Sequence, residues 1–231
     1  MRFIANLLTL IFIISIPLFL ITINIRLATN EIRLYQYGFE KYEVSAVTGI
    51  DGDELILAAK GLIEYFNSPQ EPIQISVLIA GGEVELFNER EVEHLADVKG
   101  LIRLDYYLQE GVTLYILLFA LVGSIWGGRR FLPRLSRGLL WGGILTVVLL
   151  ILLGIGALVG FDQLFLWFHH IFFSTDTWQL NPATDRLIMM FPEGFFYDAT
   201  LFIAGATAIE ALLIGGISGG LLLRKRRRVL S

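Results

Sequence analysis

Four long apolar stretches divide this sequence, and polar or charged residues separate each from the next. A membrane-spanning helix needs about 20 mainly apolar residues to cross about 30 Å of hydrocarbon. The second stretch is short and is expected to begin in the aromatic pair Tyr106-Tyr107. The pattern predicts four transmembrane helices, with apolar cores over Phe3–Ile25, Val112–Trp126, Leu139–Phe161 and Ala199–Leu223.

The first apolar stretch has the position of a signal peptide, but its make-up favours an uncleaved anchor. A single Arg precedes it, and the apolar run exceeds 20 residues, whereas the apolar region of a signal peptide has about 7–15. No small-residue cleavage pattern occurs before Asn30. We therefore expect a retained helix, kinked at Pro17 because proline removes a backbone donor.

Residues 28–110 are long enough to form a small folded domain. Asp51 followed by Glu54 resembles a capping box, in which two side chains satisfy the first amides of a helix. Asn67-Ser68-Pro69 is expected to end that helix. Its apolar positions recur at helical spacing and are Leu55, Ala58, Ala59, Leu62, Ile63 and Phe66.

A β-hairpin and a second helix are predicted to follow in the same domain. Apolar residues alternate over 73–79, Gly81-Gly82 can turn, and the run 84–87 returns. Asn88 is expected to cap a helix that continues into the second span, with a break or bend at Gly100. The predicted fold is a membrane α-helical bundle of four transmembrane helices plus a small α+β extracytoplasmic domain.

Composition supports a membrane protein and excludes several other classes. The 231-residue chain is 55% hydrophobic and 17% charged, whereas soluble domains are nearer 45–50% apolar and about 25% charged. The chain is also far too apolar for disorder. It contains no cysteine, which excludes a disulfide framework, a thiolate nucleophile and a palmitoyl anchor.

The formal net charge of −4 conceals a segregation of charge along the chain. Residues 28–110 carry sixteen acidic and six basic residues, and residues 161–198 carry five acidic residues and one basic residue. Basic residues mark the cytoplasmic side of membrane proteins. A basic tail directly after a span favours contact with lipid headgroups over nucleic-acid binding. Ten basic residues lie without a neighbouring carboxylate at Arg2, Arg129, Arg130, Arg134, Arg137, Arg224, Lys225, Arg226, Arg227 and Arg228.

Together, apolar pattern and charge predict a division of the chain into eight parts. Both termini and the basic loop are placed in the cytoplasm, and the two acidic segments outside it. The predicted parts are helix one (1–27), the extracytoplasmic α+β domain (28–110), helix two (111–128), the basic loop (129–138), helix three (139–161), an extracytoplasmic aromatic and histidine loop (162–198), helix four (199–223) and the basic tail (224–231).

All three histidines fall on the predicted outer side. Histidine is the first candidate for proton transfer because its ordinary pKa lies near neutrality. His169 and His170 lie in the aromatic run 164–173, which is expected to lie at the membrane interface, where a histidine could reach a lipid ester. The alternative is an aromatic belt with incidental histidines.

His94 has two acidic neighbours at helical spacing, Glu91 and Asp97, and either could raise its basicity or fix its tautomer. A geometric difficulty arises if the helix from residue 89 to 110 is straight and upright. His94 would then stand about 24 Å above Glu110 and could not meet an interfacial His169. The sequence therefore predicts a bend at Gly100 or a helix lying along the membrane.

Other features suggest packing more than chemistry. Glu210, in the fourth span, is a functional candidate because an intramembrane carboxylate is costly, but a bond to Thr207 or to a neighbouring helix explains it equally. Glycine pairs at Gly138/Gly142, Gly156/Gly160 and in 215–220 favour close helix packing. Nucleotide-binding, serine-hydrolase and metalloprotease motifs are absent, and the adjacent histidines lack the spacing of helical metal ligands.

Two separate blocks of residues resemble a family of small bacterial integral membrane proteins that includes the lipoprotein intramolecular transacylases, called Lit. The first block is Leu86–Lys99, which is similar to the family's FNERE…HL.DVK segment. The second block comprises Phe168–Phe173, Asp176–Trp178, Asn181–Asp185 and Phe191–Phe196. One departure from the family's pattern lies in this second block, at Asp185-Arg186, where the pattern has Asp-Pro.

The resemblance implies a membrane enzyme that moves the sn-2 acyl chain of a lipoprotein's diacylglyceryl-cysteine to the α-amine of the same cysteine, which gives the lyso-form. It implies catalytic roles for His94 and His169, with His170 at a variable position. The expected partners are a diacylated lipoprotein and membrane lipids, without nucleic acid, cofactor or metal. The candidate supporting residues are Asp97, Asp176, Trp178, Asp185, Arg186 and Glu193, and the oxyanion donor could be Trp178, Arg186 or backbone amides.

Two other hypotheses stay open at this point. One is a non-catalytic membrane protein that binds lipoproteins or lipids through its outer domain, suggested by the acidic face and the aromatic loop. The other is proton-coupled transport through Glu210, although the chain lacks the internal repeats common in transporters.

Overall fold

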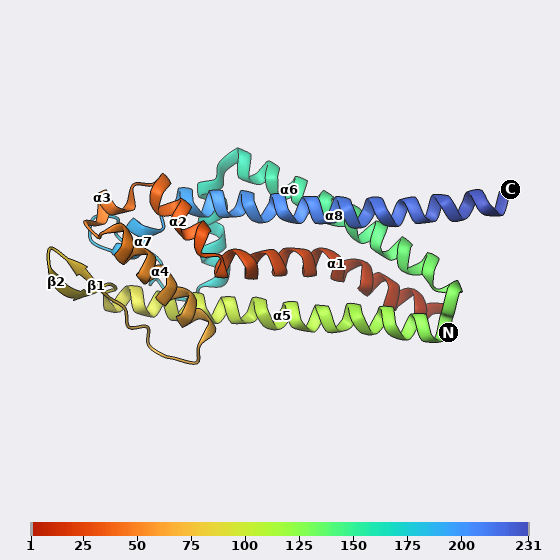
Figure 1. Ribbon diagram of the computed structural model, residues 1–231, viewed down its shortest axis with the longest axis horizontal. Coiled ribbons are helices and arrows are strands. Elements are labelled where there is room, and N and C mark those ends of the chain that lie inside the picture. The colour runs from red at the N-terminus through yellow and green to blue at the C-terminus, as the bar shows by residue number, and fades with distance from the viewer. Residues whose placement is uncertain (1, 231) are drawn as a thin grey trace. The chain divides into compact units, whose positions relative to one another are not determined.

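A computed structural model describes the backbone of residues 2–230 and all their side chains except those of Arg2, Val159 and residues 226–230. The predicted basic positions Arg2, Arg226, Arg227 and Arg228 therefore lie outside the described side chains. The element order (Figure 1) is α1 (Arg2–Asn30), α2 (Ile32–Lys41), α3 (Val44–Thr48), α4 (Gly52–Asn67), β1 (Ser76–Ile79), β2 (Gly82–Glu85), α5 (Glu89–Gly127), a 3₁₀ turn (Gly128–Arg130), α6 (Leu132–Phe172), α7 (Arg186–Met190) and α8 (Glu193–Leu230).

The chain forms two compact units. The first, called the helical unit, comprises Met1–Ile25, Tyr106–Leu158 and Phe202–Ser231. The second, called the mixed unit, comprises Arg26–Asp105 and Val159–Leu201. All three histidines belong to the mixed unit.

Four helices are long and apolar enough to cross a membrane, which confirms the predicted number of spans. Helix α5 is 39 residues long, or about 58 Å at 1.5 Å per residue, so it exceeds the hydrocarbon thickness. Its first 17 residues carry eight charges, and we therefore place its spanning part after Asp105. The candidate helices are Phe3–Asn30, Glu89–Arg130, Leu132–Leu158 and Glu193–Lys225.

The helical unit packs around α1. Phe12, Ile16 and Leu20 of this helix form a buried cluster with Ala211 of α8. The Phe12 ring stacks on Phe119 of α5, with ring centroids 4.4 Å apart. Glycines in α6 make room for α1: a Cβ on Gly138 would lie 2.7 Å from Phe12, and one on Gly142 would lie 2.6 Å from Ile16. These two glycines therefore serve the close packing that their spacing predicts.

Glu210 has a partner on another helix. The Asn24 side-chain amide of α1, itself buried, donates to the Glu210 carboxylate at 2.7 Å and to the Thr207 hydroxyl at 3.2 Å. Side-chain hydrogen bonds of this kind hold membrane helices together. The arrangement matches the structural interpretation of Glu210, and it offers no support for a transport role.

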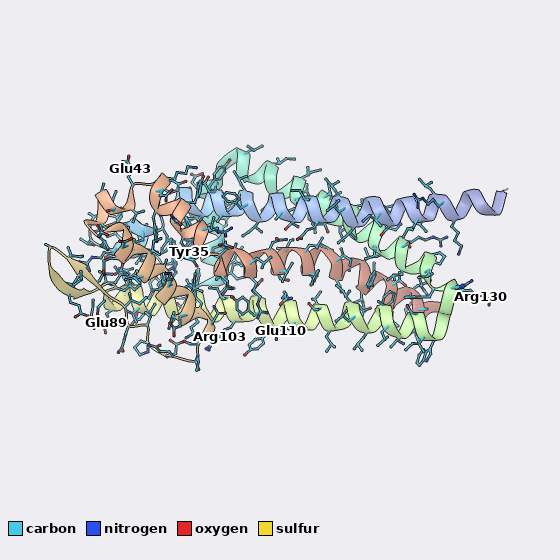
Figure 2. All side chains as sticks on the ribbon, in the orientation of Figure 1. Tyr35, Glu43, Glu89, Arg103, Glu110 and Arg130 are labelled. Atoms are coloured by element: carbon cyan, nitrogen blue, oxygen red, sulfur yellow. The ribbon has the colours of Figure 1, made fainter. Side chains whose placement is uncertain are left out.

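The mixed unit has its own apolar core, formed by α2, α3, α4, the hairpin, the first turns of α5, and the 187–195 segment. Tyr35, labelled in Figure 2, lies in this core and meets the ring of Phe191 edge-on at 5.8 Å. Strands β1 and β2 pair antiparallel, with Val77 opposite Val84. The hairpin is as predicted, but its turn lies at Ala80-Gly81, where both residues have positive φ, one position earlier than expected.

Two sequence predictions for the mixed unit were incomplete. Asp51 does cap α4, but Glu54 does not complete a capping box, because its carboxylate accepts a hydrogen bond from the Leu78 amide of β1 at 3.0 Å. The segment 162–198, expected as a loop, is helical as far as Phe172, again over α7, and from Glu193 onward. Phe191 and Phe195 of this segment pack in the core of the mixed unit, and such packing stabilises short helices.

Candidate active site

His94 is held in place by a reciprocal cap at the start of α5. The Asn88 side chain accepts a hydrogen bond from the Glu91 amide at 3.1 Å, and the Glu91 carboxylate accepts one from the Asn88 amide at 2.7 Å. This is the two-way capping pattern that satisfies orphan amides at a helix start. The other Glu91 oxygen accepts a hydrogen bond from the Leu187 amide of α7 at 2.6 Å. Glu91 therefore joins α5 to α7, and of the two acidic neighbours of His94 it is Asp97 that affects the pKa of this histidine.

A break in α6, not a bend in α5, resolves the geometric difficulty raised by the sequence. Helix α5 runs through Gly100 as one helix. Helix α6 contains a non-helical residue at Gly160, with φ 176° and ψ 93°. Residues after Gly160 belong to the mixed unit, and they bring His169 to His94. The bend at Gly100, one of the two alternatives that the sequence left open, is not observed, and the non-helical residue lies at Gly160 of α6 instead.

The two histidine rings lie close together. Their centroids are 6.1 Å apart and their planes are inclined by 29°. Nδ1 of His169 lies 2.7 Å from the Phe165 carbonyl oxygen. A carbonyl can only accept, so Nδ1 carries the proton and Nε2 of the neutral ring presents a lone pair. Nδ1 of His94 is buried and has no hydrogen-bond partner among the described residues, which is uncommon in folded proteins outside functional sites.

Aromatic side chains surround the pair. The ring of Phe173 lies 5.0 Å from that of His94 and 5.4 Å from that of His169. Phe165 and Trp178 contact the His169 ring at centroid distances of 4.4 and 4.9 Å. Apart from the imidazole nitrogens and the Trp178 N–H, these rings offer little polarity. Charge in such a setting is poorly solvated.

This burial changes the acidity of both histidines. It lowers the pKa of His94 to about 4, with the nearby His169 adding to the effect and Asp97 opposing it. Burial also lowers the pKa of His169, while the hydrogen bond to the Phe165 carbonyl opposes the shift. Both rings are therefore neutral at pH 7 and able to accept a proton.

The lowered pKa of His94 predicts acid sensitivity of the folded state. The unfolded chain takes up a proton at His94 as the pH falls through about 6.5, whereas the folded protein does so only near 4. The contribution of His94 to the free energy of unfolding should therefore be fully present above about pH 6.5. It should be lost as the pH falls toward 4, which lowers the free energy of unfolding by up to about 3 kcal/mol. Chemical denaturation at several pH values measures this slope.

Two variants separate the His94 effect from other titrations. His94→Gln should reduce the slope, because one of the two histidines with a lowered pKa is gone while His169 remains. His170→Gln makes the same substitution at an exposed histidine whose ring lies against Trp178 at 5.2 Å, and it is the control for the change of side chain itself. An unchanged slope in His94→Gln would contradict the assignment.

Of the predicted supporting residues, the structure brings Asp97 and Trp178 to the histidines. The Asp97 carboxylate accepts hydrogen bonds from the Thr175 hydroxyl at 2.9 Å and from the Thr177 hydroxyl at 3.4 Å. It thus holds the turn that carries Trp178 against His169. Asp176 in the same turn is exposed, and its backbone carbonyl accepts a hydrogen bond from Arg90 at 2.6 Å.

Of the other predicted residues, Asp185 and Arg186 support the fold around the site, and Glu193 does not. Asp185 is buried and accepts hydrogen bonds from the Asn181 amide at 2.7 Å and the Asn88 side chain at 3.1 Å. Arg186 donates to the backbone carbonyl of Glu85 at 2.9 Å, so its guanidinium is committed to the hairpin strand. Glu193 begins α8, is exposed, and makes no hydrogen bond or ion pair within the described part of the chain.

Sequence reasoning missed two elements of the site. The Phe165 carbonyl sets the His169 tautomer, and a backbone group leaves no signal in side-chain type. Phe173, which contacts both histidines, lies within the second block of residues, where the sequence pattern predicts only an aromatic residue at the membrane interface. Among residues 2–230, no group of three or more histidine, aspartate or glutamate side chains is placed to hold a metal ion.

The fold and the site together define a class of protein: a helical membrane protein with two neutral histidines in an aromatic site. A family model described as lipoprotein intramolecular transacylase Lit matches residues 10–196. The chain belongs to this family, and it is therefore an intramolecular acyltransferase of the kind that acts on bacterial lipoproteins. This outcome confirms the resemblance and disfavours a non-catalytic protein.

The chain is also similar to known proteins in sequence and in structure. A protein of Aquifex aeolicus (strain VF5), described as uncharacterized, is 28% identical over 179 residues, which cover 78% of this chain and 73% of that protein. The integral membrane transacylase Lit from Bacillus cereus superposes with a TM-score of 0.79 at 20% identity and covers 99% of this chain and 100% of its own. A form of that enzyme with one histidine replaced by arginine gives a TM-score of 0.77 at 22% identity, covering 98% and 96%. At these identities the structural similarity supports the fold.

Proposed function

We propose that the chain moves the sn-2 acyl chain of a lipoprotein's diacylglyceryl-cysteine to the α-amine of the same cysteine, with His169 and His94 handling the proton. The observation that carries this proposal is the pairing of two neutral imidazoles at 6.1 Å in an aromatic site. Such a site suits acyl transfer between two groups of one substrate. The amine and the ester belong to the same molecule, so a site that orients them and handles the proton needs no collision between separate reactants.

The proton balance of this reaction needs no outside reactant. The amine nitrogen forms a bond to the ester carbonyl carbon, and the bond from that carbon to the sn-2 oxygen breaks. The proton lost by the amine passes to an imidazole, which returns it to the leaving oxygen. General acid–base help of this kind is typically worth about 10²–10⁴-fold. No nucleophilic side chain and no cofactor is required.

We assign His169 as the proton acceptor and His94 as its partner. The Phe165 carbonyl fixes the His169 ring with Nε2 unprotonated, which is the form a base needs. The pKa of His94 is lowered to about 4, so this ring is the weaker base. A neutral His94 beside His169 can hydrogen-bond the substrate without adding a competing positive charge.

We further propose that Trp178 supplies the oxyanion donor. Arg186 is committed to hairpin carbonyls, whereas the Trp178 ring lies 4.9 Å from His169. Trp178→Phe keeps a ring against His169 but removes the indole N–H, and loss of one such donor typically costs about 10²–10³ in kcat. We expect a fall of this order with KM little changed, measured on a synthetic diacylglyceryl lipopeptide. A wild-type kcat in this variant would contradict the role of Trp178 and would indicate that backbone amides supply the oxyanion donor.

The substrate and the location follow from the same proposal. The substrate is a diacylated lipoprotein, and the site lies on the outer face of the cell membrane, with both termini in the cytoplasm. The segregation of acidic and basic residues supports this orientation. The reaction and the charge pattern give no role to nucleic acid.

The experiment that tests the proposed function is expression in a bacterium whose lipoproteins are diacylated, followed by mass spectrometry of their N-terminal peptides. We expect N-acylated cysteine with a monoacylglyceryl group. Peptides that stay entirely diacylglyceryl-cysteine, with the protein present in the membrane, would contradict the proposal.

A further inference from the structure

An apolar groove runs between α6 and α8 in the helical unit. The two helices cross in Figure 1 and are antiparallel where they touch. A Cβ on Gly143 would lie 2.8 Å from the Ala211 carbonyl oxygen, and one on Gly219 would lie 3.7 Å from Leu140. The groove has a volume of about 520 Å³ and is lined by residues that include Leu140, Ile144, Val148, Gly216, Gly220 and Leu223.

The size and chemistry of this groove fit one acyl chain. Its lining on α8 extends from Ala211 to Leu223, about 18 Å of helix at 1.5 Å per residue, close to the 15 Å or so of hydrocarbon in one leaflet. Glycines keep it open: a Cβ on Gly216 or Gly220 would meet nothing within 4 Å.

One end of the groove is strongly basic. Arg137 precedes Leu140 by one helical turn, and Arg224 and Lys225 directly follow Leu223. Because Leu140 and Gly219 are neighbours on antiparallel helices, these three side chains belong to the same end. All three are exposed, and none makes an ion pair or hydrogen bond with a residue whose side chain the structure describes. The sequence has no acidic residue from 111 to 161 or after 210.

We propose that this groove binds an anionic glycerophospholipid, with an acyl chain along the glycines and the phosphate at Arg137, Arg224 and Lys225. Uncompensated basic residues next to a membrane attract anionic headgroups. A second copy of the chain is a poorer occupant. A symmetric membrane dimer across this face would bring the same basic residues of both copies together. Repulsion between these like charges would destabilise such a dimer. The proposal does not depend on the catalytic assignment.

Native mass spectrometry of the full-length protein in detergent tests the proposal, with phosphatidylglycerol and phosphatidylcholine of identical acyl chains as probes. We expect preferential retention of phosphatidylglycerol. The double variant Arg137→Gln, Arg224→Gln should bind it about 25-fold more weakly, at about fivefold for each basic residue, and should bind phosphatidylcholine unchanged. Arg129→Gln, Arg130→Gln makes the same charge change at the exposed 3₁₀ turn and should retain the preference.

The groove itself is tested with Gly216→Leu, Gly220→Leu, which fills it with side chains and should abolish retention of both lipids. Transacylase activity on the lipopeptide reports whether this variant is folded. Equal binding of the two lipids by the wild-type protein would overturn the proposal. So would an equal loss in the Arg129 and Arg130 control, or a stable dimer that the groove-filling variant dissociates.

Discussion

Replacing His169 with alanine is expected to lower the rate of acyl transfer by about 10²–10⁴-fold, the usual contribution of a positioned general acid–base group. The Nε2 lone pair of His169 is presented by the bond from Nδ1–H to the Phe165 carbonyl, and alanine has no group that can take the amine proton. Single-turnover kinetics on a diacylglyceryl lipopeptide, with binding measured separately, would show the loss in the chemical step.

The adjacent His170 provides a matched control for this prediction. It has the same side chain, is exposed, and contacts Trp178 rather than His94. His170→Ala should therefore lower the rate by less than about 10²-fold, the smallest usual contribution of a general acid–base group. His94→Ala should also be strongly impaired. Full activity in both His169→Ala and His94→Ala would refute the residue assignment while leaving the reaction itself open.

Replacing Glu91 with alanine is expected to lower the free energy of unfolding by about 1–3 kcal/mol or somewhat more. Glu91 is 1% exposed, and its carboxylate accepts hydrogen bonds from the amides of Asn88 and Leu187. Alanine would leave the Leu187 amide without a partner in a buried setting, which costs about 1–3 kcal/mol, and the loss of the part-buried bond from the Asn88 amide adds to it. Chemical denaturation followed by tryptophan fluorescence measures the change.

Glu89 is the matched control for Glu91. It lies in the first turn of the same helix, where Figure 2 labels it, and its side chain is exposed. Glu89→Ala should lose only a favourable interaction with the helix dipole, about 0.3–1 kcal/mol. The loss of unfolding free energy in Glu91→Gln should lie between those of Glu89→Ala and Glu91→Ala. The single oxygen of the glutamine amide can accept a hydrogen bond from only one of the two backbone amides that Glu91 binds. Equal losses in Glu89→Ala and Glu91→Ala would contradict the cap between α5 and α7.

Local features of the fold followed from the sequence because short-range patterns determine them. The length of the apolar runs predicted four spans. Alternation around a glycine turn predicted the hairpin, and Asn88 was correctly expected as a cap. The two histidines were identified by residue type and by the blocks that contain them. Each of these signals lies within about twenty residues of chain.

The remaining features depend on contacts between distant segments. Gly160 redirects α6, yet a glycine in an apolar run is equally compatible with an uninterrupted helix. Glu91 was placed correctly on its helix, but its bond to Leu187 joins residues 96 positions apart. The partner of Glu210 is Asn24, 186 residues away. No periodicity reports such pairs, so the sequence alone could not choose between the open alternatives. The structure shows α5 as one helix through Gly100 and Glu91 bonded to Leu187.

Transfer of a labelled acyl chain tests the central claim most directly. The purified protein, in lipid nanodiscs, would be given a synthetic diacylglyceryl-cysteine lipopeptide that carries an isotopic label only in the sn-2 acyl chain. The proposed reaction predicts that every N-acylated product carries the label on its α-amine, with an unlabelled monoacylglyceryl group. Unlabelled N-acyl product, with the acyl chain drawn from nanodisc phospholipid or from sn-1, would contradict it.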